Sequence, residues 1–453
     1  MTKTHFLLLL SAVALIHSPQ GARSEVRLPK VLSSHMVLQR DVPLRLWGWA
    51  DPGEQVTVRM GAERVSAKAD EEGNWLVNLK AHKADDRGRE ITVSGSNEIV
   101  LEDVLFGDVW IGSGQSNMEW QLKNTNSGAK AIAAAKHPGI RLFHVPKVQH
   151  GEPQHDLNAS WNVCDPSNVP NFSAVLYFFG DRIHREMKVP VGLINSSWGG
   201  SPIEPWTIAD GQSGKMYNGM IAPLIKFSVR GTIWYQGETN VIQKNGIGYL
   251  DKMKALIGGW RAVFANAEMP FYFVQIAPWS GGQYAPGQLP ALWEGQCATL
   301  KVPQTGMIVT TDLVDNVGDI HPRNKNDVGN RLALWALAKN YGRKDVVYSG
   351  PLYKSMSVKD DKVRIEFAHM AGGLKSSDGE PLSEFEIAGE DGEFVAAEAR
   401  VGGGAVWVRA DGVTAPTRVR FGWHKKANPN LVNSAELPAS PFQTEDWQGG
   451  TGE

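Results

Sequence analysis

The stretch that decides the fold prediction is VLFGDVWIGSGQSNM, residues 104–118. Residues 104–111 are typical of a buried strand, and a glycine-rich turn follows before a predicted helix at 129–136. Ser116 would therefore lie at the C-terminal end of a strand, where open α/β sheets place their ligands and where a helix N-terminus favours developing negative charge. Ser116 is a candidate nucleophile, and the alternative interpretation is a capping serine in a tight turn.

Three common motifs do not fit this turn. The G-x-S-x-G pattern fails because Met118 stands where the second glycine would be. The dinucleotide pattern G-x-G-x-x-G fails at Asn117, and no phosphate-binding lysine with Ser or Thr follows. The serine must therefore belong to a different catalytic pattern.

Beyond this stretch, strand-like and helix-like segments alternate. Apolar strand-like runs occur at 191–198, 229–235, 270–277 and 306–313, and helical periodicity occurs at 174–187 and 326–341. This alternation predicts an α/β domain over residues 105–345, in which helices cover a parallel sheet.

Both flanks of the α/β region contain short alternating strands. Residues 25–104 predict an antiparallel β-domain, and residues 346–453 predict a second β-region with a hairpin turn at Asp391-Gly392. The pattern leaves open whether the second region forms its own domain or packs with the first.

The N-terminus predicts export. Lys3 precedes the apolar run 6–16, which is too short to span a bilayer, and small residues at 22 and 24 favour cleavage before Glu25. Residues 1–24 are thus a predicted signal peptide, and we expect a periplasmic or extracellular protein without a membrane anchor. Cys164 and Cys297 could pair after export or remain free thiols.

Composition limits the classes of partner. The 453 residues include 42% apolar, 9% aromatic and 21% charged residues, as in soluble globular proteins of two or three domains. Lysine and arginine number 46 against 48 acidic residues, a formal net charge of −2, which disfavours binding to nucleic acid by charge.

A nucleophilic serine needs a base, and the α/β region offers one at a comparable position. His321 lies in the loop after the strand-like run 306–313, and Asp319 could orient its imidazole from the same loop. Two further strand ends carry groups suited to bind an oxyanion: the backbone N–H groups of Gly199 and Gly200, and the side-chain amide of Gln236.

These motifs resemble the SGNH (GDSL-like) hydrolase superfamily, and most closely its sialate O-acetylesterase branch, which is related to acetylxylan esterases. The resemblance covers most of the chain and rests on five ordered blocks: HMVLQRDVPLRLWGWADPGEQV, GQSNMEW, NSSWGGSPIEPW, WYQGETN and DIHPRNK. It implies a flavodoxin-like three-layer fold with Ser116 as nucleophile, His321 as general base and Asp319 as the orienting acid. It further implies an oxyanion hole formed by the Ser116 N–H, Gly199 or Gly200, and Gln236.

The sequence departs from the superfamily pattern at two places. Gly318 stands three residues before the histidine, where the broad pattern has Asp, so Asp312 or Asp315 could replace Asp319 as the orienting acid. Asn240 comes one position later than the usual asparagine of the third block. For contacts with the substrate we predict Asn117, Trp198, Glu238 and Asn240.

The sequence therefore predicts an exported serine esterase that removes O-acetyl groups from sugars through an acetyl-enzyme, with no metal or cofactor. The first choice of substrate is an acetylated sialate, and acetylated xylan or xyloglucan oligosaccharides are the alternative. Two rivals remain: a glycoside hydrolase using Glu119 and Glu238 as paired carboxylates, and a noncatalytic glycan-binding protein. The sequence does not predict the oligomeric state.

Overall fold

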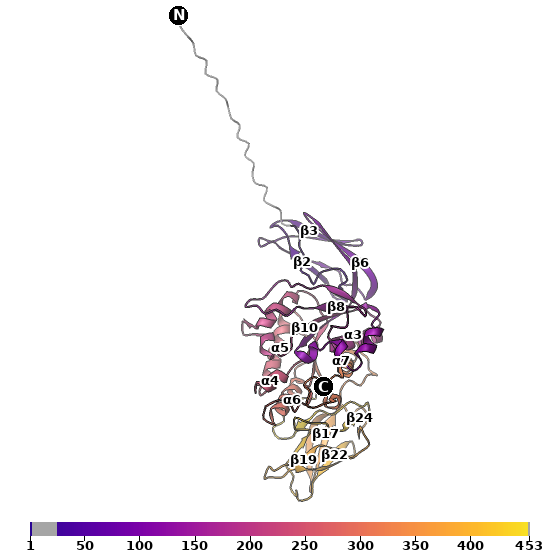
Figure 1. Cartoon of the computed structure of the whole chain (residues 1–453), viewed down its shortest axis with the longest axis vertical. Coiled ribbons are helices and arrows are strands. Elements are labelled where there is room, and N and C mark those ends of the chain that lie inside the picture. Colours follow the sequence, from indigo (N-terminus) through magenta and orange to yellow (C-terminus); the bar gives the residue numbers. More distant parts are fainter. Residues whose placement is uncertain (2–24, 452–453) are drawn as a thin grey trace.

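The computed structural model describes residue 1 and residues 25–451. Apart from Met1, the predicted signal peptide (residues 1–24) lies outside the described residues. Figure 1 shows three parts along the long axis, with a β-region at each end and an α/β region between them.

The α/β region is built on one mixed sheet. Its strands lie in the order β15-β14-β13-β7-β10-β8-β9, and the first six of these are parallel to their neighbours, whereas β9 is antiparallel to β8. The bounds are β7 (Glu98–Gly114), β8 (His137–His144), β9 (Trp161–Cys164), β10 (Val191–Ser197), β13 (Gly231–Tyr235), β14 (Phe271–Val274) and β15 (Thr305–Ile308). The predicted α/β class with a parallel sheet is confirmed. In chain order the parallel strands are β7, β8, β10, β13, β14 and β15, so β7, the first of them, lies between the third (β10) and the fourth (β13). In flavodoxin the first strand lies between the second and the third.

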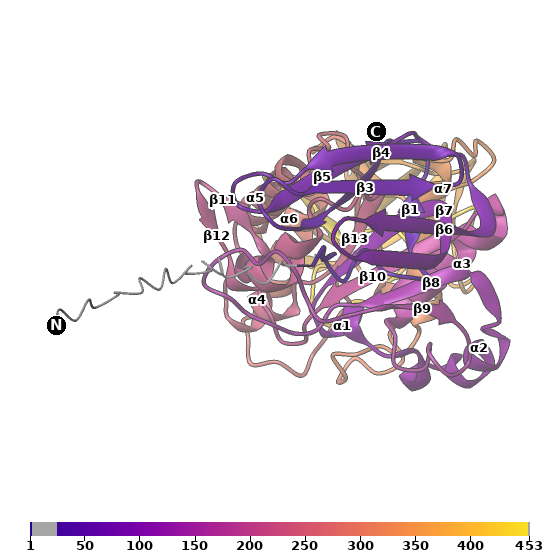
Figure 2. The same cartoon turned by 90° about the horizontal axis from the view of Figure 1, so that it is seen from above.

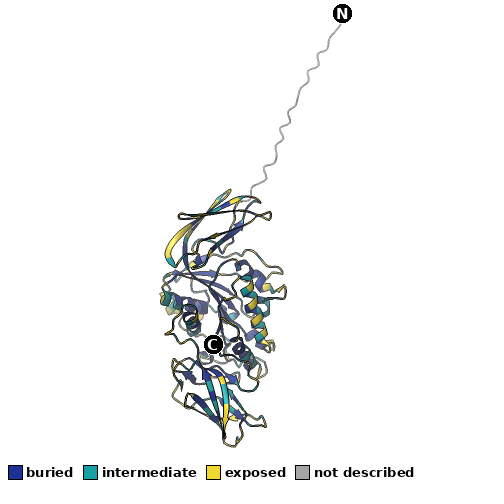
Figure 3. Ribbon diagram, turned by 180° about the vertical axis from the view of Figure 1, so that it is seen from behind, coloured by how far each residue is buried: buried dark blue, intermediate teal, exposed yellow. Residues whose placement is uncertain are grey.

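Helices cover both faces of this sheet. Helices α3 (Ala174–Met187) and α7 (Lys325–Lys339) pack together on one face, and α5 (Tyr249–Val263) and α6 (Gln288–Thr299) lie on the other (Figures 1 and 2). The predicted helix at 174–187 matches α3, which begins where the Ser173 hydroxyl accepts a hydrogen bond from the Leu176 N–H at 3.2 Å. Figure 3 shows that the sheet between the helices is buried.

Shorter elements connect these strands and helices. The remaining α-helices are α1 (Ser116–Glu119), α2 (Gly128–Ala134) and α4 (Glu238–Ile242). Short 3₁₀ turns span Leu122–Asn124, Glu204–Trp206, Ala222–Leu224 and Thr311–Leu313, a π-turn spans Tyr217–Ile221, and β11 (Ile208–Ala209) pairs with β12 (Gln212–Ser213).

The N-terminal β-region is continuous with the central sheet. The first half of β7 pairs antiparallel with β6, and its second half pairs parallel with β10 and β13, so the predicted boundary at residue 104 falls inside one strand. Apolar side chains of both parts, such as Val58, Ile91 and Ile111, belong to one hydrophobic core. The strands of this region are β1 (Val37–Gln39), β2 (Leu44–Trp49), β3 (Gln55–Met60), β4 (Glu63–Lys68), β5 (Asn74–Leu79) and β6 (Asp85–Ser94).

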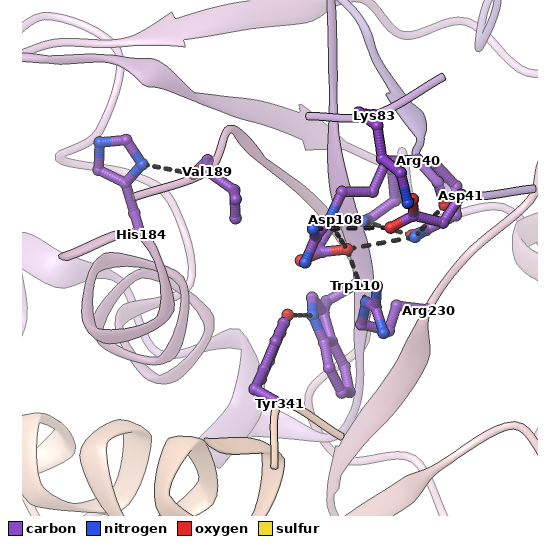
Figure 4. Close-up of polar contacts among 11 residues, drawn as sticks. Arg40, Asp41, Lys83, Asp108, Trp110, His184, Val189, Arg230 and Tyr341 are labelled. Atoms are coloured by element: carbon purple, nitrogen blue, oxygen red, sulfur yellow. Dashed lines mark hydrogen bonds and ion pairs between the residues drawn. The ribbon is translucent and has the colours of Figure 1, made fainter. Parts of the chain in front are cut away.

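A buried ion cluster reinforces this junction (Figure 4). Asp108 of β7 is fully buried and accepts hydrogen bonds from Arg40 of the N-terminal region, at 3.0 Å to each carboxylate oxygen, and from Arg230 at 2.6 Å. Burial acts to raise the pKa of Asp108, but its bonds to Arg40 and the charge of Arg230 outweigh this and hold the pKa below its usual value.

The C-terminal β-region has a hydrophobic core of its own, which includes Val363, Ile365 and Phe421. One four-stranded sheet contains β16 (Leu352–Lys359), β17 (Lys362–Ala368), β22 (Ala405–Arg409) and β21 (Glu398–Gly402). A second contains β20 (Val395–Ala396), β19 (Phe385–Ala388), β23 (Arg418–Phe421) and β25 (Phe442–Gln443), and β18 (Leu374–Ser376) pairs with β24 (Leu431–Asn433). Figure 1 places this region at the opposite end of the molecule from the N-terminal strands, so packing between the two, one of the open alternatives, is wrong.

The two cysteines do not pair. Both Cys164 and Cys297 are buried free thiols, and burial raises the pKa of each to about 12. Within residues 25–451, we find neither a helix with the length and apolarity needed to cross a bilayer nor a cluster of three or more His, Cys, Asp or Glu side chains suited to a metal ion.

Candidate active site

Ser116 follows the carboxyl end of β7 and begins α1. The preceding turn needs glycine at position 114, where φ is +131° and an added Cβ would lie 2.1 Å from the Tyr235 carbonyl oxygen. The Gln115 N–H then donates to that carbonyl at 3.0 Å, which ties the turn to the end of β13. The close approach of two strand ends thus fixes the backbone that carries Ser116.

His321 reaches Ser116 from a loop between β15 and α7. Its Nε2 lies 2.9 Å from the Ser116 Oγ, within hydrogen-bond distance, although the residues are 205 positions apart. The pKa of His321 is lowered, first by burial and then by the positive charge of Lys325, while Asp319 acts in the opposite direction. A lowered pKa favours the neutral imidazole, which is the form that can accept a proton from the serine.

Asp319 is the acid nearest to the imidazole. Its Oδ1 accepts the His321 backbone N–H at 2.9 Å and lies 3.9 Å from Nδ1, which is an ion-pair distance and too long for a hydrogen bond. The other two candidates have different partners: Asp312 binds Arg331, and Asp315 accepts a hydrogen bond from Asn126 at 3.1 Å. Among the three predicted acids, only Asp319 is thus described in contact with the histidine.

One face of the histidine is covered by an aromatic ring. Trp120 stacks on His321 with ring centroids 4.7 Å apart and an angle of 21° between the planes. The stacking restricts rotation of the imidazole and contributes to its burial.

Gly199, one of the two predicted oxyanion donors, borders the serine. A Cβ added at Gly199 would lie 3.3 Å from the Ser116 Cβ, and Gly200 has φ of +76°. The Gly199 N–H donates to the Glu119 carboxylate at 2.6 Å, and Lys147 pairs with the other oxygen of Glu119 at 2.5 Å. Trp198 is half-buried, and its backbone N–H donates to the Gly114 carbonyl at 3.0 Å.

Gln236 and Asn240 lie behind the site and not in it. Both are fully buried, and the Gln236 amide donates to Asn240 Oδ1 at 2.7 Å, to Gln115 Oε1 at 3.1 Å and to the Ser201 carbonyl at 3.2 Å. Because its amide hydrogens already have acceptors, the predicted donation by Gln236 to an oxyanion disagrees with this geometry. The predicted substrate contact of Asn240 is likewise not available, since the Asn240 amide donates to Glu204.

Asn117 and Glu238 are also buried, contrary to the prediction that they contact substrate. The Asn117 amide donates to Glu238 Oε1 at 2.5 Å and to the Ile320 carbonyl at 3.0 Å, and its Oδ1 accepts from Lys325 at 2.6 Å. Sequence reasoning missed Lys325. The available signal was its position in the DIHPRNK block, four residues after the histidine.

A serine hydroxyl beside a neutral imidazole, at a strand end with backbone N–H groups nearby, can attack an ester carbonyl and stabilise the resulting oxyanion. A serine–histidine contact at the strand ends of an α/β sheet is typical of serine esterases.

Comparison with known proteins specifies the family. Residues 106–338 match the carbohydrate esterase family described as sialic acid-specific acetylesterase. The human sialate O-acetylesterase is 30% identical over 399 residues, with 75% of each chain covered, and the rat sialate O-acetylesterase is 29% identical over 436 residues, covering 78% of this chain and 80% of the rat protein. The solved structure of a carbohydrate acetylesterase from Xanthomonas citri superposes with a TM-score of 0.89 at 40% identity, covering 93% of this chain and 100% of that one.

The chain belongs to this sialic acid-specific acetylesterase family of carbohydrate esterases. It is accordingly a carboxylic ester hydrolase that removes O-acetyl groups from carbohydrate. The family resemblance inferred from the five sequence blocks is confirmed.

Proposed function

We propose that this esterase removes O-acetyl groups from sialic acid sugars, with Ser116 as nucleophile, His321 as general base and Asp319 as the acid that favours the imidazolium. The observation that carries the catalytic assignment is the 2.9 Å contact between His321 Nε2 and Ser116 Oγ. The family match and the names of the mammalian relatives support the choice of sialate.

The reaction follows from this pair in two steps. His321 Nε2 takes the proton of Ser116 as Oγ bonds to the acetyl carbonyl carbon, and the carbonyl electrons move onto oxygen. The C–O bond to the sugar then breaks, and the sugar oxygen leaves with the proton from His321. Water repeats the sequence on the acetyl-serine, giving its proton to His321, and acetate and free Ser116 are released.

The oxyanion would be bound by the Ser116 N–H and by one of the glycines at 199 and 200. If the donor is Gly199, the Glu119 carboxylate that accepts its N–H must first move away, because two acceptors compete for one hydrogen. The pairing of Glu119 with Lys147 offers the carboxylate an alternative partner.

The rival glycoside hydrolase needs two carboxylates that both face the substrate. Glu238 is only 4% exposed and accepts a hydrogen bond from Asn117. Glu119 accepts a hydrogen bond from the Gly199 N–H and forms an ion pair with Lys147, so the two carboxylates do not form such a pair facing a substrate. We also propose export of the protein after removal of residues 1–24, on the sequence pattern given above.

The test compares Ser116→Ala with Ser127→Ala, a matched serine whose side chain makes no cap hydrogen bond at the start of α2. We expect Ser116→Ala to lose acetate release and Ser127→Ala to keep it. Retained activity in Ser116→Ala would refute the nucleophile assignment. Acetate release across acetylated sialosides, xylan and xyloglucan tests the substrate, and preference for either plant glycan would refute the sialate choice.

A further inference from the structure

A buried lysine contacts the neighbours of both Ser116 and His321 in the chain. Lys325, at the start of α7, is fully buried, and its Nζ donates to Asn117 Oδ1 at 2.6 Å and to the Pro322 carbonyl at 2.5 Å. Burying an ammonium group is costly, and lysine is rarely buried unless it is paired. Nothing in the two-step reaction above uses this side chain.

The hydrogen bonds of Lys325 and Asn117 reach carbonyl groups of the residues on either side of the histidine. The Asn117 amide donates to the carbonyl of Ile320, the residue before His321, and the Lys325 ammonium donates to the carbonyl of Pro322, the residue after it. Asn117 itself follows Ser116 in the chain. The lysine and the asparagine therefore connect the serine turn to both sides of the histidine.

We propose that Lys325 is a positioning residue: together with Asn117, it holds the carbonyls on both sides of His321 and so sets the place of the imidazole relative to Ser116. This inference rests on the proposed catalytic pair. A displacement of reacting groups by about 1 Å can cost on the order of 100-fold in rate, so such an anchor has a large kinetic effect.

The charges around the lysine are consistent with this role. Glu238 of α4 faces it through Asn117, Asp319 and His321 face it from the loop, and the rings of Tyr235 and Trp120 lie 5.6 and 5.9 Å from Nζ. Burial lowers the pKa of Lys325 to about 7, and burial raises the pKa of Glu238. The charge of Lys325 in turn lowers the pKa of His321.

An ordinary structural role would look different. A buried ammonium that made no useful contact could be replaced by an apolar side chain of similar length without loss, because the cost of desolvating its charge would disappear with it. Here the Lys325 ammonium donates to the loop that carries His321. An apolar replacement would leave the Pro322 carbonyl without this donor, and the loop would lose one of the contacts that fix the position of His321.

The experiment uses Lys325→Met, which removes both hydrogen bonds and charge, and Lys325→Gln, which removes the charge but keeps a donor. The matched control is Lys339→Met, an exposed lysine of the same helix. For hydrolysis of p-nitrophenyl acetate, we expect kcat to fall on the order of 100-fold in Lys325→Met, with KM changed by less than about threefold, and to recover in part in Lys325→Gln. In both variants the acid limb of kcat/KM should move to higher pH, because a positive charge near His321 is lost.

The outcomes separate the inference from the proposed function. If Ser116→Ala stays active, the catalytic pair itself is wrong. If Ser116→Ala is inactive while folded Lys325→Met keeps wild-type kcat and an unmoved acid limb, only the positioning role is refuted. If neither Lys325 variant folds while Lys339→Met does, Lys325 serves stability and the positioning role is likewise refuted.

Discussion

Because the contact between Asp319 and His321 is long and partly exposed, we predict that Asp319 stabilises the imidazolium less than a buried triad carboxylate does. We consider Asp319→Asn, which removes the charge while its side-chain oxygen can still accept the His321 backbone N–H, as Asp319 does at 2.9 Å. The substitution therefore isolates electrostatics from the hydrogen bond that shapes the loop.

The magnitude follows from distance and exposure. Opposite charges at the observed 3.9 Å attract by about 1 kcal/mol in water and about 4 kcal/mol at the effective dielectric constant of a protein surface. Because the Asp319 side chain is 42% exposed, screening favours the lower part of this range, about 1 to 2 kcal/mol. The imidazolium formed in the transition state should lose this amount, so kcat/KM should fall about 5- to 30-fold, compared with the roughly 10⁴-fold loss for a buried, hydrogen-bonded triad aspartate.

The assay is the pH dependence of kcat/KM for p-nitrophenyl acetate. Asp319 acts to raise the pKa of His321, so its neutralisation should lower that pKa and move the acid limb to lower pH, opposite to the shift expected for the Lys325 variants. Asp315→Asn, in the same loop but bonded to Asn126, is the control and should leave the limb in place. A loss above about 10³-fold, or no loss with an unmoved limb, would refute this account of Asp319.

Three further predictions concern the framework. Asp108→Asn should lower the free energy of unfolding by about 3 kcal/mol in urea titrations at pH 7, because it leaves two partly buried arginines without their buried counter-charge. Since the folded pKa of Asp108 is depressed, wild-type stability should fall as the pH drops below about 3.8, and the variant should lose that part of the acid dependence. Gly114→Ala should lower both Tm and kcat, since its Cβ would meet the Tyr235 carbonyl at 2.1 Å, and wild-type values would contradict the described turn. A thiol-reactive dye should label neither Cys164 nor Cys297 in the folded protein and should label both after denaturation, whereas rapid labelling of the native protein would show that they are accessible.

The sequence pattern predicted the structure correctly where interactions within a few residues determine it. The helix at 174–187 was predicted with the bounds of α3, because its apolar stripe and the serine before it act within a few residues. Strand β8 was not predicted, because Pro138 and Gly139 interrupt its pattern and its pairing with β10 supplies the order that the local sequence lacks.

The same distinction applies to the site. The strand-end positions of Ser116 and of the His321 loop favoured their meeting, since parallel strands place their carboxyl ends on one edge, and the family resemblance named them as a pair; the structure brings them to 2.9 Å. The direction of the Gln236 side chain was not readable, because it depends on acceptors contributed by three other segments. Lys325 escaped notice because lysine is almost always a surface residue, and only the folded chain shows that this one is enclosed.

The length of β7 has a consequence for any attempt to shorten the protein. One continuous strand begins at the edge of the N-terminal sheet and ends two residues before the nucleophile. Removing the N-terminal β-region at residue 104 would cut this strand, expose apolar surface along its flank and take away Arg40, which neutralises Asp108. The N-terminal strands thus support the strand that carries Ser116, and a truncated or chimeric protein would have to keep residues on both sides of position 104 together.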